Sequence, residues 1–194
     1  GERKAGTVGM VLEDVEIRIV DLEIEDEVKK NGDIGVVEVK GPNVFKGYWK
    51  QPEKTKSEFR DDGYFITGDM GFIDQDNYLT IVGRNKDLII TGGLNVYPKE
   101  IETVIDQDSK VDESAVVGVS HPDFGEGILA IIVEKKGHSI NVDIINETLR
   151  KNLAAFKLPK KIIVIKELPR NSMGKVQKNV LRDIYRDEFS DTNK

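Results

Sequence analysis

One stretch constrains this chain more than any other: Gly83–Glu102, with the sequence GRNKDLIITGGLNVYPKEIE. Its short apolar run, Leu88–Ile90, is broken by Gly92 and Gly93, the residue type most compatible with a tight turn. Pro98 suits the first position of a helix, because a backbone N–H at that position would be unpaired in any case. Carboxylates follow it, where they complement the positive end of the helix dipole. The stretch therefore predicts a strand, a glycine turn and the start of a helix.

The composition excludes several classes of protein. The chain has 194 residues, enough for one ordinary domain or two small ones, and its net charge of −6 argues against a nucleic-acid-binding surface. The absence of cysteine excludes disulfides and thiolate catalysis, and two histidines are too few for a histidine-built metal site. No apolar run approaches the ~20 residues that cross a bilayer. We therefore expect a cytoplasmic protein with no membrane span, no nucleic-acid partner and no metal site in this chain.

The first 83 residues have the pattern of strands joined by tight turns. Val15–Val20 alternates apolar and polar residues, and Ile34–Lys40 follows as a second strand, so the two predict a hairpin with a long loop. Pro52 can open a short helix. Tyr64–Thr67 and Tyr78–Val82 are further strands. This portion is predicted to be all-β.

After Arg84 the pattern changes to mixed helices and strands. Ile128–Val133 is a continuous apolar run, as expected of a central strand that is covered on both faces. Two more strands and three helices are predicted around it: strands Glu113–Val119 and Lys161–Lys166, and helices Pro98–Asp108, Asn141–Ala154 and Asn179–Phe189. Because they intermix without a long regular strand–helix repeat, we predict an α+β fold with a three-stranded sheet and flanking helices.

Three ordered motifs carry a resemblance to a known family. They are Tyr64–Asp69 (YFITGD), the stretch Gly83–Glu102, and Pro169–Lys175 (PRNSMGK). In order and spacing they resemble the carboxyl-terminal motifs of the adenylate-forming (ANL) superfamily, which includes acyl-CoA synthetases, peptide-synthetase adenylation domains and beetle luciferases. Ordered motifs of this kind are far more specific than any one of them alone.

The resemblance implies a domain organisation and a reaction. Residues 1–83 resemble the end of the β-barrel subdomain of a large amino-terminal portion, residues 84–86 a hinge, and residues 87–194 the mobile carboxyl-terminal AMP-binding-enzyme domain. The full-length protein would then be an acid–thiol ligase, an AMP-forming acyl-CoA synthetase. A carboxylate and ATP would give acyl-AMP and pyrophosphate, and the acyl group would then pass to a thiol, usually that of coenzyme A.

Two residues match nucleotide-binding positions of the family. Asp69 matches the acid that accepts hydrogen bonds from both ribose hydroxyls, a role that suits an acceptor-only carboxylate. Arg84 matches the arginine that contacts the ribose or a phosphate. The alternatives are a solvated acid for Asp69 and a surface ion pair for Arg84.

Four further positions match functional residues of the family. Lys175 matches the catalytic lysine that enters the site during acyl-AMP formation, where its charge would stabilise negative charge at the α-phosphate. Acetylation would delete that charge, so a lysine acetyltransferase is an expected partner. Lys86 matches the hinge, and Gly92 and Gly93 match the pantetheine tunnel, where the lack of Cβ lets a ligand approach the backbone. The alternative for Lys175 is a solvated lysine in a polar turn.

Three segments resemble malonyl-CoA synthetases in particular: Gly1–Gly9, His121–Gly127 and Met173–Asn179. The expected partners are a small-molecule carboxylic acid, ATP with Mg²⁺, coenzyme A and the missing amino-terminal portion, with the Mg²⁺ site outside this fragment. The sequence lacks the Ser/Thr/Gly-rich phosphate loop with which the family cradles ATP. We therefore expect the isolated fragment to be inactive.

Two other functions fit the same motifs. One is an adenylation domain that loads a carrier protein, but the chain ends at Ser190–Lys194, soon after its last predicted helix, which favours a stand-alone ligase. The other is a non-catalytic interaction module of the same fold. Against the second, Asp69, Arg84, Gly93 and Lys175 are all of the functional residue types.

Overall fold

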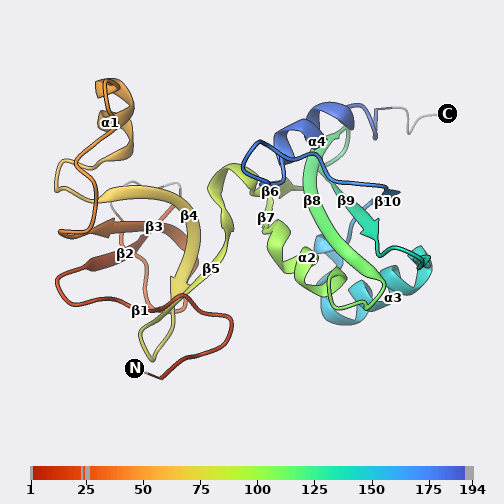
Figure 1. The fold of residues 1–194 in the computed structure, drawn as a ribbon, viewed down its shortest axis with the longest axis horizontal. Coiled ribbons are helices and arrows are strands. Elements are labelled where there is room, and N and C mark those ends of the chain that lie inside the picture. The colour runs from red at the N-terminus through yellow and green to blue at the C-terminus, as the bar shows by residue number, and fades with distance from the viewer. Residues whose placement is uncertain (1, 23, 25–26, 191–194) are drawn as a thin grey trace. The chain divides into compact units, whose positions relative to one another are not determined.

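The computed structural model describes residues 2–22, 24 and 27–190 (Figure 1). The chain divides into two compact units, unit 1 (Gly1–Lys86) and unit 2 (Asp87–Lys194). The assignment of these portions to a barrel end, a hinge and a mobile domain stays a prediction.

Unit 1 is an antiparallel sheet with one short helix. Its elements are β1 (Gly9–Met10), β2 (Glu16–Val20), β3 (Gly35–Lys40), α1 (Pro52–Glu58), β4 (Phe65–Ile73) and β5 (Tyr78–Arg84), and the strand order is β1-β5-β4-β3-β2. The predicted hairpin is confirmed, since β2 pairs with β3, and Pro52 opens α1 as expected. Among the described residues this sheet is open, without the closure of a complete barrel.

A buried carboxylate ties the sheet of unit 1 together. Glu38 of β3 is fully buried, and its two oxygens pair with Nε of Arg18 and Nε of Arg60, each at 2.8 Å. Arg18 also pairs with Asp62 at 2.6 Å, and its guanidinium lies 4.0 Å from the centroid of the Tyr64 ring. A charge is tolerated in this position because both carboxylate oxygens are paired. The network holds the segment before β4 against β2 and β3.

Unit 2 is a sheet with helices on both faces. Its elements are β6 (Ile89–Thr91), β7 (Leu94–Val96), α2 (Pro98–Ile105), β8 (Val111–His121), β9 (Gly125–Glu134), α3 (Val142–Asn152), β10 (Lys161–Ile165) and α4 (Lys178–Ile184). Strand β9 pairs antiparallel with β8 and β6 and parallel with β10. The three predicted helices are present, and Pro98 is at the start of α2 as expected. Helices α2 and α4 are shorter than predicted, because α2 ends at Ile105 and not at Asp108, and α4 ends at Ile184 and not at Phe189.

Strand β9 separates two hydrophobic cores. Its residues 128, 130 and 132 pack in the core that contains Ile105 of α2 and Leu149 of α3. Its residues 129, 131 and 133 pack in the core that contains Leu181 of α4. The prediction of a central strand covered on both faces is confirmed.

The sheet of unit 2 has two strands more than the three predicted. The predicted three are β8, β9 and β10, while β6 and β7 form an additional hairpin that joins β9 through the pair Thr91–Gly125. Strand β6 overlaps the apolar run Leu88–Ile90, for which a strand was predicted, although it was not counted in the sheet. Strand β7 was not predicted, because its three residues are too few to show the alternation by which a strand is recognised in sequence.

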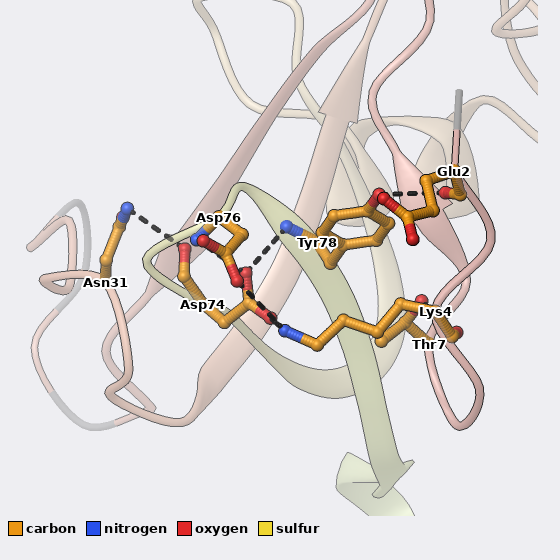
Figure 2. Close-up of polar contacts among 7 residues, drawn as sticks. All are labelled: Glu2, Lys4, Thr7, Asn31, Asp74, Asp76 and Tyr78. Carbon is orange, nitrogen blue, oxygen red and sulfur yellow. Dashed lines mark hydrogen bonds and ion pairs between the residues drawn. The ribbon is translucent and has the colours of Figure 1, made fainter.

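The amino-terminal segment is fastened to the turn between β4 and β5 (Figure 2). The Lys4 ammonium lies 2.6 Å from Asp74 Oδ2 and 3.2 Å from Asp76 Oδ2. Asp74 Oδ1 accepts the backbone N–H groups of Asp76 and Tyr78, and the Tyr78 hydroxyl donates to the Glu2 carbonyl at 2.8 Å. The Lys4 ammonium, and after it the Tyr78 N–H, hold the pKa of the Asp74 carboxyl below its usual range. The Asp74 carboxylate in turn raises the pKa of Lys4.

The ion pair between Lys4 and Asp74 predicts that the stability of the folded state depends on pH. The Asp74 carboxyl, with its lowered pKa, stabilises the folded state above its unfolded pKa of about 3.9 and loses this effect as pH falls through the folded pKa. Lys4, with its raised pKa, stabilises the folded state below its unfolded pKa of about 10.4 and loses this effect as pH rises through the folded pKa. Lys4→Met should therefore raise the pKa of Asp74, measured by the carboxyl ¹³C shift. Lys99→Met, a control on α2, should leave the pKa of Asp74 unchanged. An unchanged Asp74 pKa in Lys4→Met would contradict the ion pair between Lys4 and Asp74.

Candidate functional site

Asp69 and Arg84 are cross-strand neighbours. Strands β4 and β5 pair these two residues, and Arg84 Nε lies 2.7 Å from Asp69 Oδ1. The ion pair that was the alternative for Arg84 is thus present. The side chain of Arg84 is 53% exposed and that of Asp69 is 29% exposed, so this ion pair contributes little to stability. It does fix one carboxylate oxygen of Asp69, and Oδ2 keeps lone pairs for other donors.

The Thr67 hydroxyl fixes the backbone that carries Asp69. It donates to the Val37 carbonyl of β3 at 2.8 Å and accepts the N–H of Asp69 at 3.0 Å. Gly68, between them, has a φ of 73°, a left-handed conformation that favours glycine. Strand β4 then continues to Ile73. The sequence analysis gave no role to Thr67. In the structure, its hydroxyl group positions the backbone of Asp69 within β4.

Gly92 and Gly93 form the turn between β6 and β7. Their φ angles are 57° and 78°, the pair of left-handed conformations of a two-residue hairpin turn. The N–H of Gly92 donates to the Phe124 carbonyl at 2.9 Å, and a Cβ on Gly93 would meet no atom within 4 Å. The turn alone accounts for both glycines, so their role at a pantetheine tunnel stays a prediction.

Lys175 lies on the loop that connects β10 to α4, and its side chain is exposed. The loop folds back on itself, because Arg170 and Val176 form an antiparallel bridge and the Asn171 N–H donates to the Lys175 carbonyl at 3.0 Å. Gly174 makes the turn with a φ of 77°. Within the part of the chain that the structure describes, the Lys175 ammonium forms no ion pair. The ammonium is therefore accessible to a ligand.

A buried carboxylate connects α2 with the start of α4. Glu102 of α2 is 7% exposed; its Oε1 accepts the Val116 N–H of β8 at 2.9 Å and lies 2.6 Å from Lys178 Nζ. Both partners are needed, because a buried carboxylate without them would be strongly destabilising. The sequence had indicated only a helix-dipole role for Glu102, whereas its side chain holds the end of the Lys175 loop.

Lys86 lies at the boundary of the two units, in the short 3₁₀ helix Asn85–Asp87. Just before it, Arg84 pairs with Asp69 in unit 1. Just after it, Asp87 Oδ1 lies 2.5 Å from Nη2 of Arg182, which belongs to α4 in unit 2. Residues on both sides of Lys86 are thus held by ion pairs within their own units. The hinge role of Lys86 stays a prediction.

Metal clusters and membrane spans are absent from residues 2–22, 24 and 27–190. These residues contain no group of three or more His, Cys, Asp or Glu side chains that could hold a metal ion. None of their helices has the length and apolar character needed to cross a membrane.

Residues 100–175 match the family described as AMP-binding enzyme C-terminal domain. The match begins inside α2 and ends at Lys175, so it includes the buried Glu102 and the loop that folds back from Arg170 as far as Lys175.

CoA ligases are similar to this chain well beyond that domain. The Humulus lupulus protein "Probable CoA ligase CCL8" is 42% identical over 94% of this chain and 32% of its own length. The malonate–CoA ligase of Arabidopsis thaliana is 39% identical over 94% of this chain and 31% of its own length. The crystal structure of ATP-bound MatB from Rhodopseudomonas palustris has 58% identity and a TM-score of 0.90, over 97% of this chain and 37% of that one. The chain spans about a third of the length of the relatives it matches.

These similarities confirm the resemblance to acyl-CoA synthetases and the α+β fold. They do not test the roles of individual residues. Lys175 is the last residue of the matched region. The other predicted site residues precede the first residue of that region: Asp69, Arg84, Lys86, Gly92 and Gly93. All six roles therefore enter below as proposals.

The glycine turn predicts a graded response to substitution. Gly93→Ala should lower the free energy of unfolding by about 1–2 kcal/mol, because alanine disfavours a φ of 78° while the added methyl group meets no neighbour. Gly93→Asn should cost less, since asparagine tolerates this conformation. Gly83→Ala is the control, because it adds the same methyl group in open space without a left-handed φ. Denaturant unfolding measures all three; equal losses for Ala and Asn would show that the backbone conformation is not the cause.

Proposed function

We propose that the protein to which this chain belongs is an AMP-forming acid–CoA ligase and that this chain supplies its catalytic lysine, Lys175. The observation that carries the proposal is the exposed ammonium of Lys175 on a tightly hydrogen-bonded loop at the end of the AMP-binding enzyme C-terminal domain. A carboxylate attacks the α-phosphorus of ATP, which gives acyl-AMP and pyrophosphate. The thiol of coenzyme A then attacks the acyl carbon and releases AMP.

Lys175 acts in the first half-reaction. Negative charge collects where the carboxylate oxygen meets the α-phosphate, and a compact ammonium placed there stabilises the transition state more than the ground state. The ammonium neither donates its proton nor forms a covalent bond. Its contribution depends on charge and position alone.

Asp69 and Arg84 hold the nucleotide in this proposal. Arg84 orients the carboxylate of Asp69 through the 2.7 Å contact, and the remaining lone pairs of Asp69 accept the ribose hydroxyls. Gly92 and Gly93 border the path of pantetheine in the second half-reaction, where the open space at Gly93 supports close approach of a ligand. Lys86 is the hinge between the half-reactions.

We propose malonate as the acid, supported by the three segments that resemble malonyl-CoA synthetases and by the Arabidopsis malonate–CoA ligase at 39% identity. The proposals on Mg²⁺, on the cellular location and on acetylation rest on the same family resemblance. Mg²⁺ would accompany ATP on its phosphates and bind no residue of this chain. The enzyme would work in the cytoplasm, and a lysine acetyltransferase would find the side chain of Lys175 exposed.

The role of Lys175 predicts a split between the half-reactions. In the full-length enzyme, Lys175→Ala should slow acyl-AMP formation by roughly a hundredfold, about 3 kcal/mol, because one preorganised charge is removed from the transition state. Formation of acyl-CoA from supplied acyl-AMP should be unchanged. Pyrophosphate exchange and single-turnover thioester formation measure the two steps, with Lys151→Ala on α3 as the control. An equal loss in both steps would contradict the proposed role.

The hinge proposal predicts the opposite effect on the two half-reactions: a substitution at Lys86 should block thioester formation and spare acyl-AMP formation. Lys86→Pro should leave acyl-AMP formation largely intact and block thioester formation, because proline fixes φ near −65° and so traps one arrangement. Lys86→Ala should be tolerated in both steps, since a hinge needs backbone freedom and not an ammonium. The same two assays apply. If Lys86→Ala is as damaging as Lys86→Pro, the side chain matters and the hinge assignment is wrong.

A further inference from the structure

The Lys175 loop is organised around the side chain of Asn171. Asn171 Oδ1 accepts the backbone N–H of Met173 at 3.0 Å and that of Lys175 at 2.9 Å. The backbone of Asn171 makes two more bonds to the same loop: its N–H donates to the Lys175 carbonyl, and its carbonyl accepts the Gly174 N–H at 2.9 Å. One residue therefore forms four hydrogen bonds to residues 173–175, and two of them fix Lys175 itself.

The loop is also fastened to the rest of unit 2. Arg170 donates to the Gly174 carbonyl at 2.6 Å and forms an ion pair with Glu113 of β8. At the other end of the loop, Lys178 pairs with the buried Glu102. These contacts hold the two ends of the loop against β8 and α2. At the tip, Arg170 binds the carbonyl of Gly174, whereas the backbone N–H groups of Met173 and Lys175 are bound by the side chain of Asn171.

We propose that Asn171 is a positioning residue for the catalytic ammonium of Lys175. This inference rests on the proposed function of Lys175. The amide of Asn171 holds the main chain from which the long lysine side chain extends, so a loss of its two hydrogen bonds changes where the ammonium lies on average. A displacement of about 1 Å in an active site can cost roughly a hundredfold in rate, because electrostatic stabilisation requires a preorganised charge. Asn171 itself contacts no substrate in this account.

The chain offers a matched set of variants. Asn171→Ala removes both side-chain hydrogen bonds. Asn171→Asp keeps a carboxyl oxygen at the position of Oδ1, so it can still accept the N–H groups of Met173 and Lys175. Ser172→Ala is the control, because Ser172 is exposed on the same loop and lies outside the hydrogen bonds of the Asn171 side chain.

In the full-length enzyme, Asn171→Ala should slow acyl-AMP formation by about tenfold to a hundredfold and leave thioester formation from supplied acyl-AMP unchanged. Asn171→Asp should restore most of the loss, and Ser172→Ala should have no effect. In a Lys175→Ala background, Asn171→Ala should cause no additional loss, because Asn171 acts through Lys175. Amide hydrogen exchange should show faster exchange of the Lys175 N–H in Asn171→Ala and not in Asn171→Asp.

The outcomes separate this inference from the proposed function. If Lys175→Ala leaves acyl-AMP formation unchanged, the proposed function fails. If Lys175→Ala slows that step and Asn171→Ala does not, the proposed function stands and the positioning role is wrong. An additional loss from Asn171→Ala in the Lys175→Ala background, or equal losses in both half-reactions, would also overturn it, because Asn171 would then act by another route.

Discussion

Burial of β9 on both faces is the interaction on which unit 2 depends. Residues 128–133 alternate between the two cores, and full burial of one aliphatic side chain contributes about 1.5–3 kcal/mol. Helix α2 and the Lys175 loop are attached to β8, the partner strand of β9. Glu102 of α2 accepts the N–H of Val116 on β8, and Arg170 pairs with Glu113 on the same strand. The Lys175 loop is therefore fixed to the most strongly buried part of the unit.

This attachment limits how the ammonium of Lys175 can move. A loop that moved alone would have to break the Lys178 pair with a buried carboxylate, the Arg170 pair and the hydrogen bonds of Asn171. In the proposed mechanism Lys175 instead enters and leaves with unit 2 as one body, which is the behaviour of hinge motion between rigid parts. The same proposal assigns the change in backbone torsions to Lys86, which lies in the chain between Arg84 and Asp87.

The features that could be predicted from sequence depend on neighbours in the chain. The apolar run at residues 128–133 and Pro98 at the start of α2 each carry their own local signal, and both predictions are confirmed. Glu102 shows the limit of such prediction from sequence. A carboxylate near the start of a helix is already explained by its interaction with the helix dipole, so nothing in the sequence indicated a further role. Its actual partners, Val116 and Lys178, lie 14 and 76 residues away in the chain. Only the assembled fold brings them together, so no local pattern could indicate them.

The pairing of Asp69 with Arg84 shows the same limit in the site itself. In sequence, an ion pair and a nucleotide contact were alternatives for Arg84, since a residue 15 positions from its partner gives no sign of facing it. The fold places them opposite each other on β4 and β5, beside the irregularity in register at Met70 and Gly71. An exposed ion pair is worth about 0–1 kcal/mol, so stability is a weak reason for this arrangement. Its clearer effect is geometric, because Arg84 and the backbone held by Thr67 together fix the direction of the Asp69 carboxylate. In the proposed function, a carboxylate fixed in this way accepts the hydrogen bonds of the two ribose hydroxyls.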